Sequence, residues 1–195
     1  MSLSTYALTT LAKLKRALNI ANTEYDTYLE ECIDRATAII HKHTRRNLLL
    51  QTYTAQVYDA PAGGVLWLPQ YPIKTISLLT DDGSSVVAAD YYLYSKTGAV
   101  ELIDGNHWSG VQRGITITYA AGYDSSNTDH TYDLFQLDAV CLAVATRLYR
   151  ASPISRQHYG QVEDLTDEPV YAEQALDGGL MYRLSPYVRT WIAAI

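Results

Sequence analysis

Two long stretches with helical hydrophobic periodicity, separated by a strand-rich segment, constrain this chain more than any other feature. Apolar side chains recur every three or four positions over residues 24–45 and again over 131–151. This spacing places them on one face of an α-helix. We therefore predict two long helices, each with a single buried face. The residues of these faces are Leu29, Cys32, Ile33, Ala36, Ile39, Ile40 and His43 in the first helix, and Leu134, Leu137, Val140, Cys141, Val144, Ala145 and Leu148 in the second.

The ends of these helices also carry signals in the sequence. A shorter amphipathic helix is predicted over 9–19, before the first long one. Thr23, with Asp26 three residues later, resembles an N-terminal capping box in which Asp replaces Glu. Arg45 and Arg46 are expected in the last turn of the same helix, where cations interact favourably with the helix dipole. Pro153 prevents the second long helix from continuing.

The segment between the long helices, residues 48–122, is rich in Thr, Val, Ile, Tyr and turn residues. Asp81-Asp82-Gly83 and Lys96-Thr97-Gly98 each separate two short apolar runs, which is a hairpin pattern. Strands this close together are expected to form antiparallel meanders, because parallel crossovers need a dozen or more residues. The predicted strands are 49–58, 65–68, 73–80, 86–88, 91–95, 99–103 and 114–120.

Beyond residue 151 the pattern changes again. Residues 152–179 are polar, acidic and aperiodic, and the stretch is longer than ordinary connections in compact domains. We expect residues 152–195 to form an extended arm that ends in a short apolar helix after Ser185-Pro186. The predicted fold class is α+β: an α-helical bundle with an antiparallel β insertion at about 49–120 and a C-terminal arm. Residues 1–151 are expected to form the core, with 152–195 as the arm.

Composition narrows the classes of function. The formal net charge is −6 and the pI is near 5.3, which disfavours tight nucleic-acid binding by a single chain. No apolar run exceeds seven residues, so no membrane partner is expected, and no secretory signal is visible at the N-terminus. The chain has 17 Tyr and one Phe. Tyrosine is enriched in protein interfaces and also in strands, and both explanations stay open.

Catalytic and metal-binding patterns are not found in the sequence. His41 and His43 are two positions apart on a helix and point about 200° away from each other, so they cannot share a metal ion. The phosphate-binding, dinucleotide-binding and nucleophile-elbow motifs are not present. We therefore expect no catalytic residues, no metal site and no cofactor. Carboxylates distant in sequence could still converge in space, so an enzyme or a ligand-binding β domain remains an alternative.

Several short phrases, taken in order, resemble the head–tail connector proteins of tailed bacteriophages, also called adaptor or head-completion proteins. The resemblance covers roughly residues 9–151, and the phrase at 184–187 gives weaker support. The phrases are Asp34-Arg35-Ala36, Thr44-Arg45-Arg46-Asn47, Gln51-Thr52-Tyr53, Leu66-Trp67-Leu68-Pro69, Tyr71-Pro72-Ile73, Ile117-Thr118-Tyr119-Ala120-Ala121-Gly122-Tyr123, Leu148-Tyr149-Arg150 and Leu184-Ser185-Pro186-Tyr187.

This resemblance implies a structural virion protein at the neck, made in the host cytoplasm. Such proteins form a ring, typically of twelve copies, beneath the portal protein; the ring extends the DNA channel and presents a platform to the next neck or tail protein. Double-stranded DNA would pass through the lumen without sequence-specific binding. The C-terminal segment grips the portal in this family, and the corresponding residues are Tyr187, Val188, Arg189, Trp191, Ile192 and Ile195.

Two points stay open within this interpretation. An acidic lumen would repel phosphate and let DNA slide, yet a charge of −6 is equally ordinary for solubility. The acidic stretch 161–179 departs from the family pattern, and the resemblance assigns it no partner. A different neck or tail-completion protein is the alternative of the same class.

Overall fold

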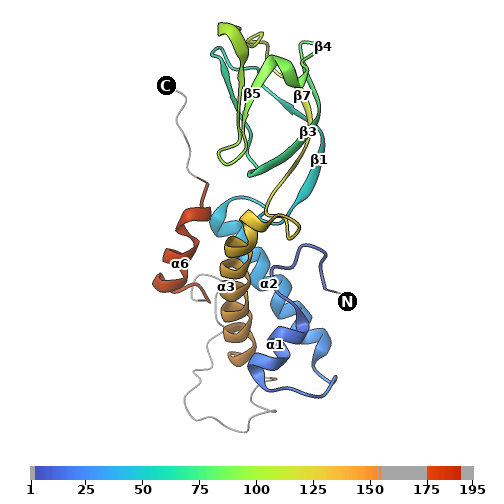
Figure 1. Ribbon diagram of the computed structural model, residues 1–195. Helices are drawn as coiled ribbons and strands as arrows, with labels where there is room; N and C mark the ends of the chain where they lie inside the picture. The colour runs from blue at the N-terminus through green and yellow to red at the C-terminus, as the bar shows by residue number, and fades with distance from the viewer. Residues whose placement is uncertain (1–2, 153, 155–174, 190–195) are drawn as a thin grey trace. The chain divides into compact units, whose positions relative to one another are not determined.

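The computed structural model describes residues 3–152, 154 and 175–189 (Figure 1). The chain divides into two compact units, one formed by the residues before Arg46 and after Ser126, the other by residues 46–126. The first is helical, and the second consists of antiparallel sheets. The predicted α+β class, with a β insertion between helices, is confirmed.

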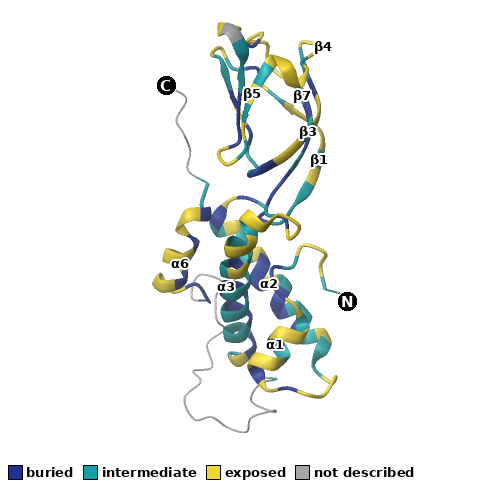
Figure 2. Ribbon diagram, in the orientation of Figure 1, coloured by how far each residue is buried: buried dark blue, intermediate teal, exposed yellow. Residues whose placement is uncertain are grey.

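Four α-helices are described in the helical unit: α1 (Leu11–Leu18), α2 (Asp26–Thr44), α3 (Thr131–Arg150) and α6 (Gly178–Leu184). The two long helices pack against each other in antiparallel directions. The Tyr28 and Tyr149 ring centroids are 6.2 Å apart at one end, and Thr37 Oγ1 lies 3.6 Å from Cys141 Sγ further along. Most residues of the predicted stripes are buried, and α2 and α3 each carry dark segments in Figure 2. Ile39, His43, Leu134 and Leu148 are only half-buried, and Tyr149 is buried although it was not predicted.

The start of α2 differs from the prediction. The helix begins at Asp26, its N-cap is Tyr25, and no side chain caps it, so the predicted cap at Thr23 is wrong. The Asp26 carboxylate instead forms an ion pair with the Lys15 ammonium of α1, at 2.5 Å. A partly buried ion pair is a stronger interaction for this carboxylate than a single amide at the helix end. The shorter helix α1 does have a side-chain cap, because Thr10 Oγ1 accepts from Lys13 N.

The end of α2 also differs. The helix stops at Thr44, and Arg45 follows as a left-handed C-cap with φ of 58°. Arg46 lies beyond the helix, in the β unit, where it is buried with its guanidinium 3.9 Å from the centroid of the Tyr71 ring. It also donates to the Tyr71 carbonyl at 2.8 Å. Placing both arginines in the last helical turn was therefore wrong, because stacking and hydrogen bonding hold Arg46 elsewhere.

The β unit contains two sheets, and every ladder between its named strands is antiparallel, as predicted. One sheet has the order β1-β7-β3-β4 and the other the order β2-β6-β5. The expected meander is found only for β3–β4 and β5–β6. The strands are β1 (Gln51–Tyr58), β2 (Val65–Trp67), β3 (Ile73–Asp81), β4 (Ser84–Ser85), β5 (Tyr91–Tyr94), β6 (Ala99–Leu102) and β7 (Ile115–Ala121).

The last strand takes the central place in the larger sheet, which explains why a simple meander does not form. β7 pairs with β1 on one side and with β3 on the other. Its residues alternate between buried and half-buried, and Ile115, Ile117 and Tyr119 are among the buried ones. A strand with a fully buried face and partners on both edges buries more apolar area than a strand at the edge.

The predicted strand 86–88 is wrong. Asp82 and Gly83 both have positive φ, of 47° and 76°, and form a two-residue turn that brings Ser84 directly beside Asp81. After two residues of β4 the chain turns again, because Val87 N donates to the Asp90 carboxylate at 3.0 Å. The short 3₁₀ helix η1 (Ala88–Asp90) then leads into β5.

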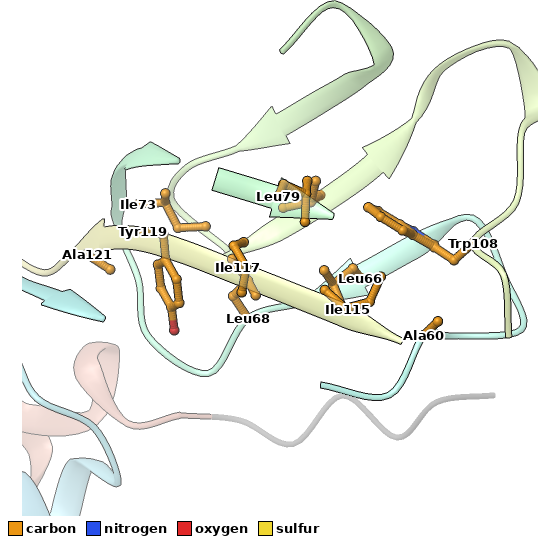
Figure 3. Close-up of a cluster of buried hydrophobic side chains, with 11 residues drawn as sticks. Ala60, Leu66, Leu68, Ile73, Leu79, Trp108, Ile115, Ile117, Tyr119 and Ala121 are labelled. Carbon is orange, nitrogen blue, oxygen red and sulfur yellow. The ribbon is translucent and has the colours of Figure 1, made fainter. Parts of the chain in front are cut away.

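The two sheets pack face to face around one hydrophobic cluster (Figure 3). Side chains from β7 and β3 meet Leu66 and Val100 of the smaller sheet. Trp108 enters from a loop, and its indole Nε1 donates to the Gly64 carbonyl at 3.1 Å. The cluster consists of Ala60, Leu66, Leu68, Ile73, Leu79, Val100, Trp108, Ile115, Ile117, Tyr119 and Ala121.

The C-terminal region contains a helix that the sequence did not predict. Gly178–Leu184 form α6, which starts at the end of the stretch 152–179 that was expected to be polar and aperiodic, and Ser185–Tyr187 follow as the 3₁₀ helix η4. Most of the predicted arm, residues 155–174, and the last part of the predicted terminal helix, 190–195, lie outside the described residues. None of the helices that the structure describes has the length and apolarity that crossing a membrane requires.

Candidate assembly surfaces

The predicted portal-binding segment starts on the surface of its own helical unit. Tyr187 is buried, and its hydroxyl donates to the Asp133 carboxylate at 2.8 Å. Val188 and Arg189 are half-buried, and Arg189 N donates to the Thr44 carbonyl at 3.0 Å. These contacts hold residues 187–189 against the helical unit. Trp191, Ile192 and Ile195 lie outside the described residues.

The helix before this segment is tied to α3 by charge. Arg147 donates to the Ala175 carbonyl at 3.2 Å and to the Asp177 carboxylate at 2.5 Å. Asp177 also caps α6, because its other oxygen accepts from Leu180 N at 2.8 Å. The Arg147 guanidinium, followed by the backbone donors, lowers the pKa of Asp177. These contacts hold α6 on the helical unit, and the side chains of α6 that are buried are Leu180 and Leu184.

Large side chains of the helical unit remain exposed on α3 and α6. Tyr132 and Phe135 are 71% and 67% exposed, and Tyr182 on α6 is 81% exposed. Tyr132 and Phe135 are three positions apart and therefore share one face of α3, outside the stripe that packs against α2. Sequence reasoning did not single them out, although their position off the buried stripe was a readable signal. Exposed aromatic groups at helical spacing are typical of protein interfaces.

The smaller sheet of the β unit presents a second exposed surface, which we call the aromatic patch: Trp67, Tyr92, Tyr94, Ala99 and Glu101. The inward residues of this sheet alternate with these outward ones, as the period of a strand requires. Trp67, Tyr92 and Tyr94 are 44%, 57% and 50% exposed. Tyr94 Oη donates to Glu101 Oε2 at 2.9 Å, and this hydrogen bond raises the pKa of Tyr94.

Buried polar contacts elsewhere have a structural explanation. The Lys74 ammonium and Ser126 hold the Asp124 carboxylate and lower its pKa below the usual range. Burial lowers the pKa of His41 and raises the pKa of the Cys32 thiol to about 11. In the part of the chain that the structure describes, no three His, Cys, Asp or Glu side chains are grouped so that they could hold a metal ion. The expected lack of catalytic chemistry stays a prediction.

Comparison with known proteins gives matches of two kinds. Residues 8–80 match the family model described as phage gp6-like head-tail connector protein. The resemblance to head–tail connector proteins is confirmed. The comparison with curated proteins found no match.

The fold of this chain is also found in solved structures of gene transfer agent (GTA) particles. A chain in the neck of an empty GTA particle, computed with C6 symmetry, matches with a TM-score of 0.61 and 16% identity. A chain in the neck of a native GTA particle, computed with C12 symmetry, matches with a TM-score of 0.60 and 15% identity. A chain in the virion of a native gene transfer agent particle gives 0.57 and 16%. Each match covers 100% of this chain and 96% of the other.

Proposed function

We propose that this protein is a structural component of the virion neck, a non-enzymatic connector that forms a ring beneath the portal protein. The observation that carries the proposal is the connector-family match of residues 8–80, together with whole-chain fold matches to neck chains. The neck location predicted from the sequence agrees with the particles in which that fold occurs. The C6 and C12 symmetries of those necks support a ring of twelve copies.

The surfaces described above fit such a role. A ring requires a heterologous contact, in which one face of each copy binds a different face of its neighbour. The exposed Tyr132 and Phe135 on α3 supply an aromatic face for such a contact. Within the ring, a lumen lined by carboxylates would repel DNA phosphate, so DNA would pass without sequence-specific binding. The ring would extend the DNA channel and offer a platform to the next neck or tail protein.

Portal binding is assigned to the C-terminal segment, with a division of roles that the structure suggests. Tyr187 serves its own helical unit through Asp133, so its contribution is to position the segment. Val188, Arg189, Trp191, Ile192 and Ile195 then remain as the residues that contact the portal. Trp191 and the two isoleucines supply apolar groups of the kind that dominate interface energetics.

The decisive experiment combines the full chain with the portal protein of the same particle, and examines the complex by electron microscopy. We expect a ring attached to the portal. A truncation after Arg189 keeps Tyr187 and the fold but removes Trp191, Ile192 and Ile195, and should abolish attachment. A matched variant, Tyr6→Ser, changes an exposed aromatic outside the segment and outside the surfaces described above, and should still attach.

Two outcomes would contradict the proposal. If no ring forms on the portal, the connector role is wrong, and a position in another neck or tail layer of the particle would identify the alternative completion protein. If the truncated chain attaches as well as the full one, the proposed ring is not contradicted, but the assignment of portal binding to the C-terminal segment is wrong.

A further inference from the structure

The aromatic patch of the smaller sheet places aromatic rings, a small residue and a carboxylate in a defined arrangement. In β2, β6 and β5, Trp67 pairs with Ala99, which pairs with Tyr94. The neighbouring outward row is Val65, Glu101 and Tyr92. Ala99 is buried although it belongs to the outward face, because the two flanking side chains are large and its own is a single methyl. Two rings therefore stand on either side of a small residue, with a carboxylate beside it.

The Glu101 carboxylate is only partly satisfied. Its Oε2 accepts from the Tyr94 hydroxyl at 2.9 Å. Among the described residues, no lysine, arginine or histidine lies within ion-pair distance of this carboxylate. It is half-buried within the aromatic patch. A carboxylate that is partly shielded from water gains more from a cation than a fully exposed one does.

From this geometry we infer that the aromatic patch receives an arginine side chain of a partner protein. A guanidinium is planar, stacks on tyrosine and tryptophan rings, and donates two hydrogen bonds to a carboxylate. Trp67 and Tyr94 provide the rings and Glu101 provides the acceptor. Lysine carries a compact, strongly hydrated ammonium that cannot stack in this way. The partner is thus a protein surface with an exposed arginine, and the inference does not depend on ring formation or on the portal.

The inference can be tested on the isolated full chain by NMR, with short capped peptides as probes. The probe is acetyl-Gly-Arg-Gly-amide, and the neutral comparison is the same peptide with citrulline, which keeps the shape of the side chain. We expect the arginine peptide to shift the Trp67 indole signal and the amide signals of Tyr94 and Glu101. The response to citrulline should be weaker by about threefold or more.

Variants separate the patch from non-specific charge effects. Glu101→Gln keeps an acceptor for Tyr94 but removes the charge, and Trp67→Leu keeps an apolar side chain but removes a ring. Both should weaken arginine binding by about threefold or more. Glu30→Gln removes the same charge from α2 in the helical unit and should leave binding unchanged. Unchanged far-UV circular dichroism shows that each variant is folded.

Several outcomes would overturn the inference. They are no shift with the arginine peptide, equal shifts with citrulline, or binding that persists in Glu101→Gln. An equal response to a lysine peptide would overturn the choice of arginine. Shifts of the same residues that appear on concentrating the chain without peptide would show that a second copy occupies the patch. All of these leave the portal-attachment experiment unaffected.

Discussion

At the scale of single residues, the phrases that carry the connector resemblance have local structural causes. Gly122, in the phrase Tyr119-Ala120-Ala121-Gly122-Tyr123, has a φ of 121° and donates to the Pro72 carbonyl at 2.8 Å. A Cβ there would lie 2.4 Å from the Leu49 carbonyl oxygen. Only glycine allows both this backbone conformation and this close approach.

We therefore expect Gly122→Ala to lower the free energy of unfolding of the β unit by roughly 2 kcal/mol or more, from backbone strain and the clash with Leu49. Gly63→Ala is the matched control, since an added Cβ at Gly63 meets nothing within 4 Å. It should be neutral or slightly stabilising. Urea denaturation followed by tryptophan fluorescence measures both, in a Trp191→Phe background so that only Trp67 and Trp108 of the β unit report. Equal stabilities of the two variants would contradict the argument.

Arg46, another residue in these phrases, contacts two aromatic rings. Its guanidinium lies over the Tyr71 ring, with the Tyr123 ring centroid at 5.9 Å on a second side. Three phrases that are distant in sequence thus meet around one side chain. The resemblance rests on the order of these phrases in the sequence. In the structure, Arg46 and Tyr123 bring the two ends of the β insertion together.

At the scale of elements, α3 has two faces with different requirements. Val144 is completely buried against the other helices, whereas Phe135 is exposed. An aspartate at Val144 would bury a charge without a partner, which costs several kcal/mol, a large part of the stability of an ordinary domain. We expect Val144→Asp to abolish the cooperative thermal unfolding of the helical unit measured by far-UV circular dichroism.

The opposite face supplies the control for that prediction. Phe135→Asp places the same charge in water and should change the stability by less than about 1 kcal/mol. A stable Val144→Asp variant would show that the buried stripe of α3 has been assigned to the wrong residues.

The helices and the sheets differ in how far the sequence determines them. Helices over 24–45 and 131–151 follow from periodicity, and their observed bounds differ by only a few residues. The sheet order could not be predicted, because strand pairing depends on distant partners and not on local pattern. α6 was missed because the Arg147–Asp177 contact that holds it joins segments thirty residues apart.

The candidate surfaces also differ in how far they could be predicted from the sequence. The C-terminal segment was named from the resemblance alone, whereas the aromatic patch could not be found before the sheet was known. Trp67, Tyr94 and Glu101 come from three strands, and only the observed register places them on one face. Single-strand alternation predicts which side a residue faces, but it does not predict its neighbours across the sheet.

At the scale of the whole molecule, each unit has residues whose reactivity or fluorescence can report on its folding. Both cysteines, Cys32 and Cys141, belong to the helical unit and are buried. Burial raises the pKa of their thiols to about 11 and about 12. Trp67 and Trp108 belong to the β unit, whereas the third tryptophan, Trp191, lies outside that unit. Thiol chemistry therefore follows the helical unit, and tryptophan fluorescence follows the β unit once Trp191 is replaced by Phe.

We expect both thiols to react with a disulfide reagent at pH 8 at least about a hundredfold more slowly in the native protein than in denaturant. The reactive species is the thiolate, and a raised pKa leaves little of it at this pH, while burial also blocks access. Native labelling then requires transient opening of the packing around the thiols, so its rate should rise with a destabilising change in α3 such as Val140→Ala. Rapid native labelling of either thiol would show that the packing between α2 and α3 is open in solution. The mass of the labelled protein after a short pulse distinguishes one modified thiol from two, and thus local opening at one cysteine from cooperative unfolding of the helical unit.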